Sequence, residues 1–233
     1  MIYGIVNFLD DKEEDKMYYQ FLIEDRSSEI LVNRIMEKIK KKYSDIYYDS
    51  KQFHGIGRLP KGNNAKEIKN GKLLNDLAIY MRGFNKSLQG MDSVLVIVVD
   101  NDDRIPDEFI RELEGVASCN QINIDYAFCI AIEEIEAWLL GDEKALLEAY
   151  PSARVSVLHN YIQDSICGTW EVLADVLYKG GYDKLKQNSS SYAEIGKVKC
   201  EWADRIGQCL DITKNSSPSF NNFISNIEKR AVC

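Results

Sequence analysis

Histidine is scarce in this chain, which limits the chemistry that its side chains can perform. The 233 residues include two histidines, His54 and His159, which argues against a zinc site and against a hydrolase triad with an imidazole base. The six cysteines are scattered without a C-x-x-C pair, which indicates free buried thiols rather than a disulfide framework. If the chain is catalytic, carboxylates and a hard metal ion are the expected means.

Long apolar runs are also absent. None approaches the roughly 18–20 residues that a membrane span needs. The apolar opening Met1–Leu9 has no basic residue before it and runs directly into acidic residues, unlike a signal peptide. Hydrophobic residues make up 45% of the chain and aromatic residues 10%, which is typical of globular proteins. We therefore expect a soluble, cytoplasmic protein of one large or two small domains.

Basic residues are fewer than acidic residues in this chain. The chain has 29 basic and 37 acidic residues, a net charge of −8, which argues against binding nucleic acid by bulk charge alone. Basic residues nevertheless gather in three places: Lys38, Lys40, Lys41 and Lys42; Arg58, Lys61, Lys66, Lys69 and Lys72; and Lys197, Lys199 and Arg205. These clusters have two interpretations, solvated surfaces or a patch that follows a nucleic-acid backbone.

Strand and helix patterns alternate over the first 150 residues. The expected strands are Tyr18–Ile23, Ile46–Phe53, Val94–Val99 and Tyr126–Ile132. Val94–Val99 is apolar without alternation, as expected for a strand covered on both faces of a parallel sheet. Helical patterns follow each strand, so the predicted fold is α/β with a mostly parallel sheet.

Local signals predict where several helices begin and end. Ser27 and Ser28 are the expected N-cap of the first helix, and Pro106 lies near the start of the helix Asp107–Val116. Glu133–Leu140 has a helical pattern, with Gly141 as its C-cap and Asp142 as the N-cap of the next helix. Beyond Pro151 the patterns are helical only. We expect residues 1–150 to form the α/β domain and residues 151–233 a helical C-terminal portion.

Acidic residues follow several of the expected strands. Glu24 comes after the first, Asp100 and Asp102 after the most buried one, and Glu133, Glu134 and Glu136 after the next. In open α/β sheets, sites form at the carboxyl ends of the strands. Asp100 and Asp102 are two positions apart and can point the same way, as Mg²⁺ or Mn²⁺ would require. The alternative is that these acids are turn and cap residues.

Two of these segments resemble a known catalytic module. LIEDRSSE and LVIVVDNDD are similar to the glutamate turn and the D-x-D strand of a TOPRIM domain, which is found in topoisomerases, primases and OLD-type nucleases. The segments FHGIGRLPK, IAIEEIEAWLLGD and NSSPSFNNFI together resemble a bacterial TOPRIM-like family of unknown function, related to RloB-like and OLD-like proteins. The resemblance extends over roughly Tyr18 to Ile227.

The resemblance implies roles for individual residues. It implies Mg²⁺- or Mn²⁺-dependent phosphodiester chemistry, with Glu24 as general acid/base and Asp100 and Asp102 as metal ligands. Glu136 is either a ligand of a second metal ion or a partner of a backbone N–H at the start of a helix. Arg58 and Lys61 lie in the glycine-containing loop, where Arg58 is either a phosphate contact or a solvated loop residue. Glu134 has no assigned role.

The sequence suggests three candidate functions. The leading one is a metal-dependent nuclease that acts in antiphage defence beside an ATPase partner encoded nearby. The alternative is a non-catalytic TOPRIM-like binding or regulatory subunit. A phosphatase of the haloacid-dehalogenase type also uses D-x-D, but it expects the nucleophilic Asp after the first strand, whereas Asp100 follows a later strand. We therefore discount the phosphatase.

Overall fold

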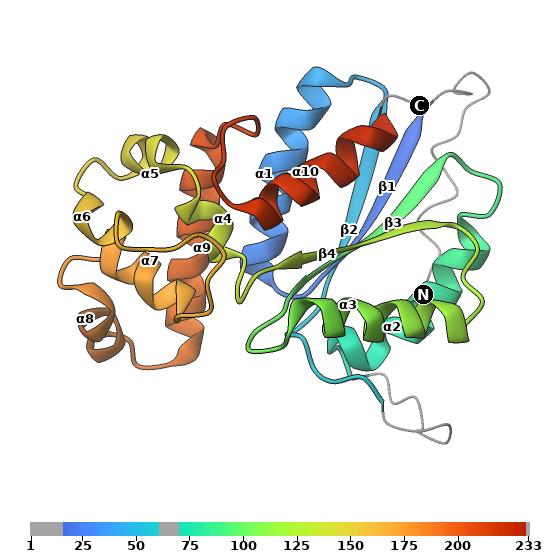
Figure 1. The fold of residues 1–233 in the computed structure, drawn as a ribbon, viewed down its shortest axis with the longest axis horizontal. Helices are drawn as coiled ribbons and strands as arrows, with labels where there is room; N and C mark the ends of the chain where they lie inside the picture. Colours follow the sequence, from blue (N-terminus) through green and yellow to red (C-terminus); the bar gives the residue numbers. More distant parts are fainter. Residues whose placement is uncertain (1–15, 61–69, 232–233) are drawn as a thin grey trace.

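A computed structural model describes residues 16–60 and 70–231 and has an α/β fold with one sheet (Figure 1). The strands are β1 (Met17–Ile23), β2 (Ile46–Gln52), β3 (Ser93–Asp100) and β4 (Asp125–Ala131). They lie in the order β2-β1-β3-β4, and every neighbouring pair is parallel. The predicted parallel α/β sheet is confirmed.

The helices divide into those that connect the strands and those that follow the sheet. The connecting helices are α1 (Arg26–Lys42), α2 (Leu73–Ser87) and α3 (Pro106–Cys119). The later helices are α4 (Glu136–Leu140), α5 (Glu143–Ala149), α6 (Val155–Leu158), α7 (Thr169–Leu177), α8 (Gly181–Asn188), α9 (Tyr192–Cys209) and α10 (Pro218–Ala231). Within the described residues, no strand follows β4, and no helix is long and apolar enough to cross a membrane.

Strand β3 lies between β1 and β4, and all eight of its residues are buried. One face of the sheet packs with α1 and α10, and the opposite face packs with α2 and α3 (Figure 1). Val94, Val96 and Val98 belong to the first apolar cluster, whereas Leu95 and Ile97 belong to the second. Cover on both faces explains why this strand has no polar alternation.

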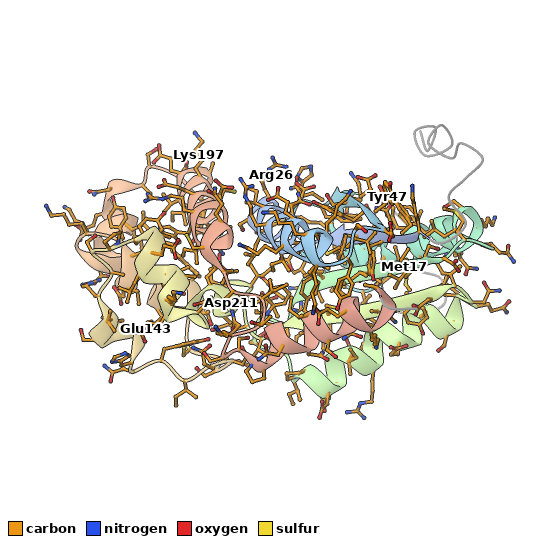
Figure 2. The ribbon with its side chains drawn as sticks, turned by 90° about the horizontal axis from the view of Figure 1, so that it is seen from above. Met17, Arg26, Tyr47, Glu143, Lys197 and Asp211 are labelled. Atoms are coloured by element: carbon orange, nitrogen blue, oxygen red, sulfur yellow. The ribbon has the colours of Figure 1, made fainter. Side chains whose placement is uncertain are left out.

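Helices α4 to α9 lie beyond the end of the sheet toward which β4 points (Figure 1). Figure 2 shows the elongated result, with Met17 of the sheet and Glu143 of α5 toward opposite ends. The expected domain boundary at residue 150 falls between α5 and α6, yet one buried cluster contains Leu146 from before it and Leu173 and Ile206 from after it. The helical portion and one face of the sheet therefore share a continuous apolar core.

Helix α10 returns from the helical portion to the sheet. The Tyr19 hydroxyl of β1 donates to the backbone oxygen of Ile227 at 2.9 Å. Arg230 Nη2 donates to Asp125 Oδ1 at 2.8 Å, which joins the end of α10 to the start of β4. The Phe21 and Phe223 rings lie 6.5 Å apart, between centroids. The most C-terminal helix therefore completes the core over β1.

Two local predictions are wrong in instructive ways. The N-cap of α1 is Asp25, not the two serines, because Asp25 Oδ1 accepts from the backbone N–H of Ser28 at 2.8 Å. The helix expected from Glu133 begins at Glu136, because Glu133 has a φ of +59° and the chain turns there. The predicted cap of α5 is confirmed, since Asp142 Oδ1 accepts from the N–H of Ala145 at 3.0 Å.

Candidate functional site

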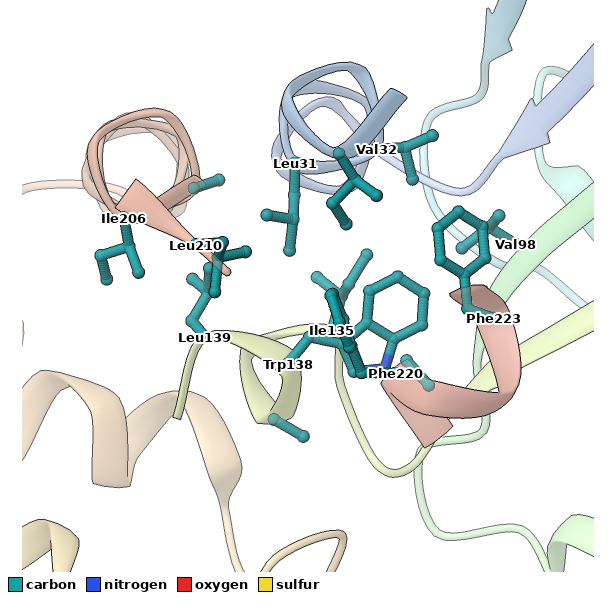
Figure 3. Close-up of a cluster of buried hydrophobic side chains, with 14 of the residues drawn as sticks. Leu31, Val32, Val98, Ile135, Trp138, Leu139, Ile206, Leu210, Phe220 and Phe223 are labelled. Atoms are coloured by element: carbon teal, nitrogen blue, oxygen red, sulfur yellow. The ribbon is translucent and has the colours of Figure 1, made fainter. Parts of the chain in front are cut away.

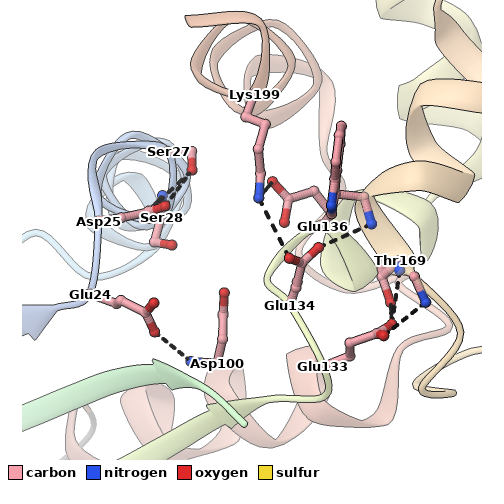
Figure 4. A network of polar contacts seen from close by, with 12 residues as sticks. Glu24, Asp25, Ser27, Ser28, Asp100, Glu133, Glu134, Glu136, Thr169 and Lys199 are labelled. Atoms are coloured by element: carbon pink, nitrogen blue, oxygen red, sulfur yellow. Dashed lines mark hydrogen bonds and ion pairs between the residues drawn. The ribbon is translucent and has the colours of Figure 1, made fainter. Parts of the chain in front are cut away.

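Glu24 and Asp100 meet at the carboxyl edge of the sheet. Glu24 directly follows β1, Asp100 ends β3, and these two strands are neighbours. Glu24 Oε2 accepts a hydrogen bond from the backbone N–H of Asp100 at 3.3 Å (Figure 4). Parallel pairing brings the two acids together, because residues that follow aligned strands leave the sheet at the same edge.

Asp102 lies at this edge but faces a different partner. Strand β3 ends at Asp100, and Asp102 has a φ of +50°, so the two-residue periodicity of a strand does not extend to it. Its Oδ2 pairs with Arg104 Nη1 at 2.7 Å, and its side chain is 45% exposed. Asp100 is buried, so the two aspartates have different surroundings. The charge of Asp102 still contributes to raising the pKa of Glu24.

Glu136, the first residue of α4, is buried against a lysine of α9. Lys199 Nζ lies 3.1 Å from Glu136 Oε1 and 3.9 Å from Glu134 Oε1 (Figure 4). The Lys199 side chain is 17% exposed, so this member of the third basic cluster is not a solvated surface residue. The sequence suggested a metal ion or a backbone N–H as the partner of Glu136, and it did not indicate Lys199.

The carboxylates around Lys199 have raised pKa values. Burial raises the pKa of Glu24 to about 7, with Asp25 and Asp102 adding to the shift. Burial and then Glu136 raise the pKa of Glu134 to about 8. Burial, followed by the charge of Glu24, raises the pKa of Asp100 well above its ordinary range. The site thus has more buried negative charge than its lysine neutralises.

Two buried oxygen atoms at the site have no hydrogen-bond partner. They are Glu136 Oε2 and Ser28 Oγ, in residues that are 1% and 2% exposed. Figure 4 shows the Asp100 side chain pointing away from the sheet, on the side of the cluster where Ser28 and Lys199 lie. Leaving such atoms unpaired in the interior costs about 1–3 kcal/mol each. They are available to a further ligand.

The carboxylates do not form a ready ligand set. In residues 16–60 and 70–231, no three His, Cys, Asp or Glu side chains are placed so that they could hold one metal ion as they stand. A cavity of about 210 Å³ opens beside the site, and its lining includes Asp102, Asp103, Trp170 and Glu171. Its acidic walls would repel a phosphate unless a cation were present.

The loop that contains Arg58 reaches the same edge of the sheet. The backbone N–H of Gly55 donates to the backbone oxygen of Glu24 at 3.0 Å, which joins this loop to the end of β1. Gly57 has a φ of +71°, and a Cβ there would lie 2.2 Å from Asn75 Oδ1. The Arg58 side chain is exposed. Lys61, the other expected phosphate contact, lies outside the described residues.

Glu133 has a structural role that the sequence did not indicate. Its carboxylate accepts hydrogen bonds from the backbone N–H groups of Cys167, Gly168 and Thr169 at 2.8–3.0 Å, and from the Thr169 hydroxyl. Partial burial works to raise its pKa, but the hydrogen bonds of Thr169 and its neighbours lower it overall. Glu133 therefore caps α7 from the end of β4 and joins the sheet to the helical portion.

Two of the segments that carry the family resemblance pack against each other. Trp138 Nε1, in EAWLLGD, donates to Ser219 Oγ at 2.9 Å, and Asn215 Nδ2 donates to the backbone oxygen of Trp138 at 2.8 Å. The Trp138 ring stacks on Phe223 with centroids 4.9 Å apart (Figure 3). Four residues of this stretch, Ala137, Trp138, Leu139 and Leu140, belong to the buried apolar core.

Comparisons with protein-family models, with curated proteins and with solved structures find no match. The TOPRIM-like relationship therefore stays a prediction from the sequence motifs. The structure contributes the arrangement of the residues: an all-parallel sheet, Glu24 and Asp100 in contact at neighbouring strand ends, and a buried lysine among carboxylates.

Proposed function

We propose that this chain is a TOPRIM-like nuclease that hydrolyses phosphodiester bonds with Mg²⁺ or Mn²⁺. The observation that carries the proposal is the contact of Glu24 with Asp100 at adjacent ends of parallel strands. Both carboxyl groups have raised pKa values, because they are buried close to other acidic side chains. Buried carboxylates repel one another strongly, and a divalent cation is the usual means of relieving that repulsion.

The chemistry of the donor set suits such an ion. Every candidate donor is a carboxylate or hydroxyl oxygen, which hard cations prefer, and Glu136 Oε2 and Ser28 Oγ lack any other partner. Asp100, Glu24 and Glu136 would hold the ion, with Asp102 at the rim. When bound, the ion would polarise a phosphodiester oxygen and make water a stronger nucleophile.

The chain's own residues supply the remaining functions. Glu24 takes the role of general acid/base that the resemblance implies, and burial raises the pKa of its carboxyl to about 7 before any ion binds. Its hydrogen bond to the Asp100 N–H fixes the carboxylate at the strand end. Arg58 is exposed on the neighbouring loop, and together with Lys61 it would contact the phosphates of a nucleic-acid substrate.

A second candidate function is a non-catalytic binding or regulatory subunit. The observation that favours it is the ion pair of Lys199 with Glu136, which already places a positive charge among the acids without any metal. The net charge of −8 points the same way, because it opposes binding of nucleic acid. An ATPase encoded nearby is the proposed partner in either case.

A cleavage assay separates the two functions. Supercoiled plasmid and tRNA are incubated with the wild-type chain in Mn²⁺, in Mg²⁺ and in EDTA. We expect metal-dependent cleavage of at least one substrate, loss of cleavage in Asp100→Asn, and retention in the matched control Asp103→Asn, whose side chain is exposed. Cleavage that continues in EDTA or in Asp100→Asn contradicts the proposal. No cleavage by wild type, alone or with its ATPase, favours the subunit.

A further inference from the structure

We propose that Asn101 is a positioning residue of the candidate site, because its side-chain amide holds Asp102 and Glu133 in place. Asn101 lies between the two aspartates of the D-N-D segment and is fully buried, with an exposed fraction of 0%. It therefore acts through its neighbours and not by touching a substrate. The inference rests on the proposed function, in which Asp102 lies at the rim of the site.

The amide of Asn101 joins three segments of the chain. Its Oδ1 accepts a hydrogen bond from the backbone N–H of Glu133, which follows β4, and its Nδ2 donates to the backbone oxygen of Arg104, which precedes α3. The backbone N–H of Asn101 also donates to the backbone oxygen of Ala131, at the end of β4, at 3.1 Å. One buried residue thus connects the end of β3, the turn toward α3 and the end of β4.

The residues that Asn101 holds have an uncommon backbone conformation. Asp102 has a φ of +50° and Glu133 a φ of +59°, in a region that few residues other than glycine adopt. The backbone N–H of Asp102 donates to the backbone oxygen of Glu133 at 3.0 Å. Such conformations persist where the surrounding contacts determine them. Asn101 supplies these contacts on both sides, to Glu133 itself and to Arg104, two positions after Asp102.

The backbone of Asp102 determines where its carboxylate lies. Asp102 Oδ2 pairs with Arg104 Nη1 at 2.7 Å, and the same Nη1 donates to the backbone oxygen of Asn101 at 3.2 Å. Asp102 and Glu133 both line the cavity of about 210 Å³ beside the site. Asn101 therefore holds the part of the cavity wall that comes from the two strand ends.

The two hydrogen bonds explain why the residue is an asparagine. An amide offers an acceptor and a donor on one planar group. The backbone N–H of Glu133 needs the acceptor, and the backbone oxygen of Arg104 needs the donor. An ionised aspartate could not donate, and an alanine would supply neither bond.

Cleavage kinetics of Asn101→Ala test the positioning role. The matched control is Asn215→Ala, because Asn215 is also buried and also donates to a backbone oxygen, of Trp138, and accepts from a backbone N–H, of Ser217. Neither of these partners lies at a strand end. Both variants therefore lose the same kind of hydrogen-bond pair.

The assay uses Mn²⁺ and a substrate that wild type cleaves, at a temperature at which both variants are folded. We expect the kcat of Asn101→Ala to fall by about 10- to 100-fold, because displacing a group at a site by about 1 Å has an effect of this order. KM should stay within about twofold of wild type, since the proposed phosphate contacts are unchanged. Asn215→Ala should keep the wild-type kcat.

Amide hydrogen exchange tests the same role without catalysis. In Asn101→Ala the backbone N–H of Asp102 should exchange about tenfold faster than in wild type, because the Glu133 oxygen that accepts its hydrogen bond is no longer held. In Asn215→Ala this rate should match wild type. If Asn101→Ala does not fold, Asn101→Ser, which can keep at most one of the two bonds, replaces it in both measurements, with changes expected in the same direction.

The outcomes separate this inference from the proposed function. A folded Asn101 variant with wild-type kcat, or with wild-type exchange at Asp102, overturns the inference and leaves the proposed function intact. An equal loss of kcat in Asn215→Ala overturns it as well, because reduced stability would then explain the loss. If wild type cleaves no substrate with either metal, the proposed function fails and the catalytic part of the inference fails with it. The exchange rate at Asp102 then still decides whether Asn101 holds that residue.

Discussion

The backbone N–H of Asp100 donates to the carboxylate of Glu24 at 3.3 Å, although 76 positions of sequence separate the two residues. The contact exists because β1 and β3 are neighbours in a parallel sheet. The hydrogen bond keeps the Glu24 carboxyl, whose pKa is raised, in a largely buried position. The protonation of Glu24 and the stability of the fold are therefore linked.

Replacing Glu24 with glutamine should change how stability depends on pH. The pKa of Glu24 is about 7 in the folded chain, against 4.5 for an ordinary glutamate. Its contribution to the free energy of unfolding is therefore fully present below pH 4.5 and is lost as the pH rises through about 7. Glutamine resembles the protonated acid, so Glu24→Gln should match wild type at pH 4.5 and exceed it at pH 8 by on the order of 3 kcal/mol.

Urea unfolding in EDTA at both pH values measures this difference. The matched control is Glu112→Gln, an exposed position on α3. Its stability relative to wild type should not change between the two pH values. Equal stability of wild type and Glu24→Gln at pH 8 would contradict the burial of an ionised Glu24.

The Asp100→Asn variant should lose the stabilisation that a metal ion gives to wild type. At a Mn²⁺ concentration of 100 times Kd, binding adds about 2.7 kcal/mol, which corresponds to a rise in Tm of roughly 5–10 °C. Without metal the variant should be at least as stable as wild type, because it removes a charge from a repulsive cluster. Differential scanning fluorimetry with and without Mn²⁺ measures both effects, and Asp103→Asn should behave like wild type. If millimolar Mn²⁺ does not change the Tm of wild type, the result favours the non-catalytic binding or regulatory subunit.

Glu133→Ala should destabilise the chain, because it removes the carboxylate that caps α7. The loss leaves the N–H groups of Cys167, Gly168 and Thr169 without their partner and should cost roughly 1–3 kcal/mol. Because the pKa of Glu133 is lowered, the wild-type advantage is present above pH 4.5 and declines as the pH falls below it. Urea unfolding at pH 7 and pH 4 checks both statements. An advantage that grows on acidification would refute the capping role.

Gly141→Ala should be destabilising for a steric reason alone. Gly141 has a φ of −74°, which alanine adopts without strain, but a Cβ would lie 1.9 Å from Asn215 Oδ1. Asn215 also donates to the backbone oxygen of Trp138, so its displacement should cost roughly 1–3 kcal/mol. The matched control is Gly115→Ala on α3, where a Cβ meets nothing within 4 Å. The control should gain up to about 1 kcal/mol of stability, and thermal melts of the two variants should move in opposite directions.

The strands were predictable from sequence because burial determines their composition. Val94–Val99 lacks polar residues since both faces of β3 are covered, and the structure extends this strand by one residue at each end. Parallel pairing then placed the acids that follow β1 and β3 at one edge. The general position of Glu24 and Asp100 could thus be inferred before any coordinates.

The partners of these acids could not be predicted in the same way. Lys199 lies on α9, far along the chain from Glu136, and a lysine in a basic cluster is normally solvated. Glu133 caps a helix that begins 36 positions later, whereas capping signals are read from adjacent residues. Such contacts depend on how the helical portion packs, and no local pattern specifies that packing.

The position of α10 on the sheet has a consequence for how the chain is made. The Tyr19 hydroxyl cannot form its hydrogen bond to the backbone oxygen of Ile227 until Ile227, 208 positions later, has been synthesised. At roughly 5–20 residues per second, a ribosome needs roughly ten to forty seconds to synthesise that interval. During this time the apolar face formed by Tyr19, Phe21 and Ile23 lacks its final cover. Transient exposure of such a face favours association with other chains, and it ends only when α10 packs onto the sheet and the face is completely buried.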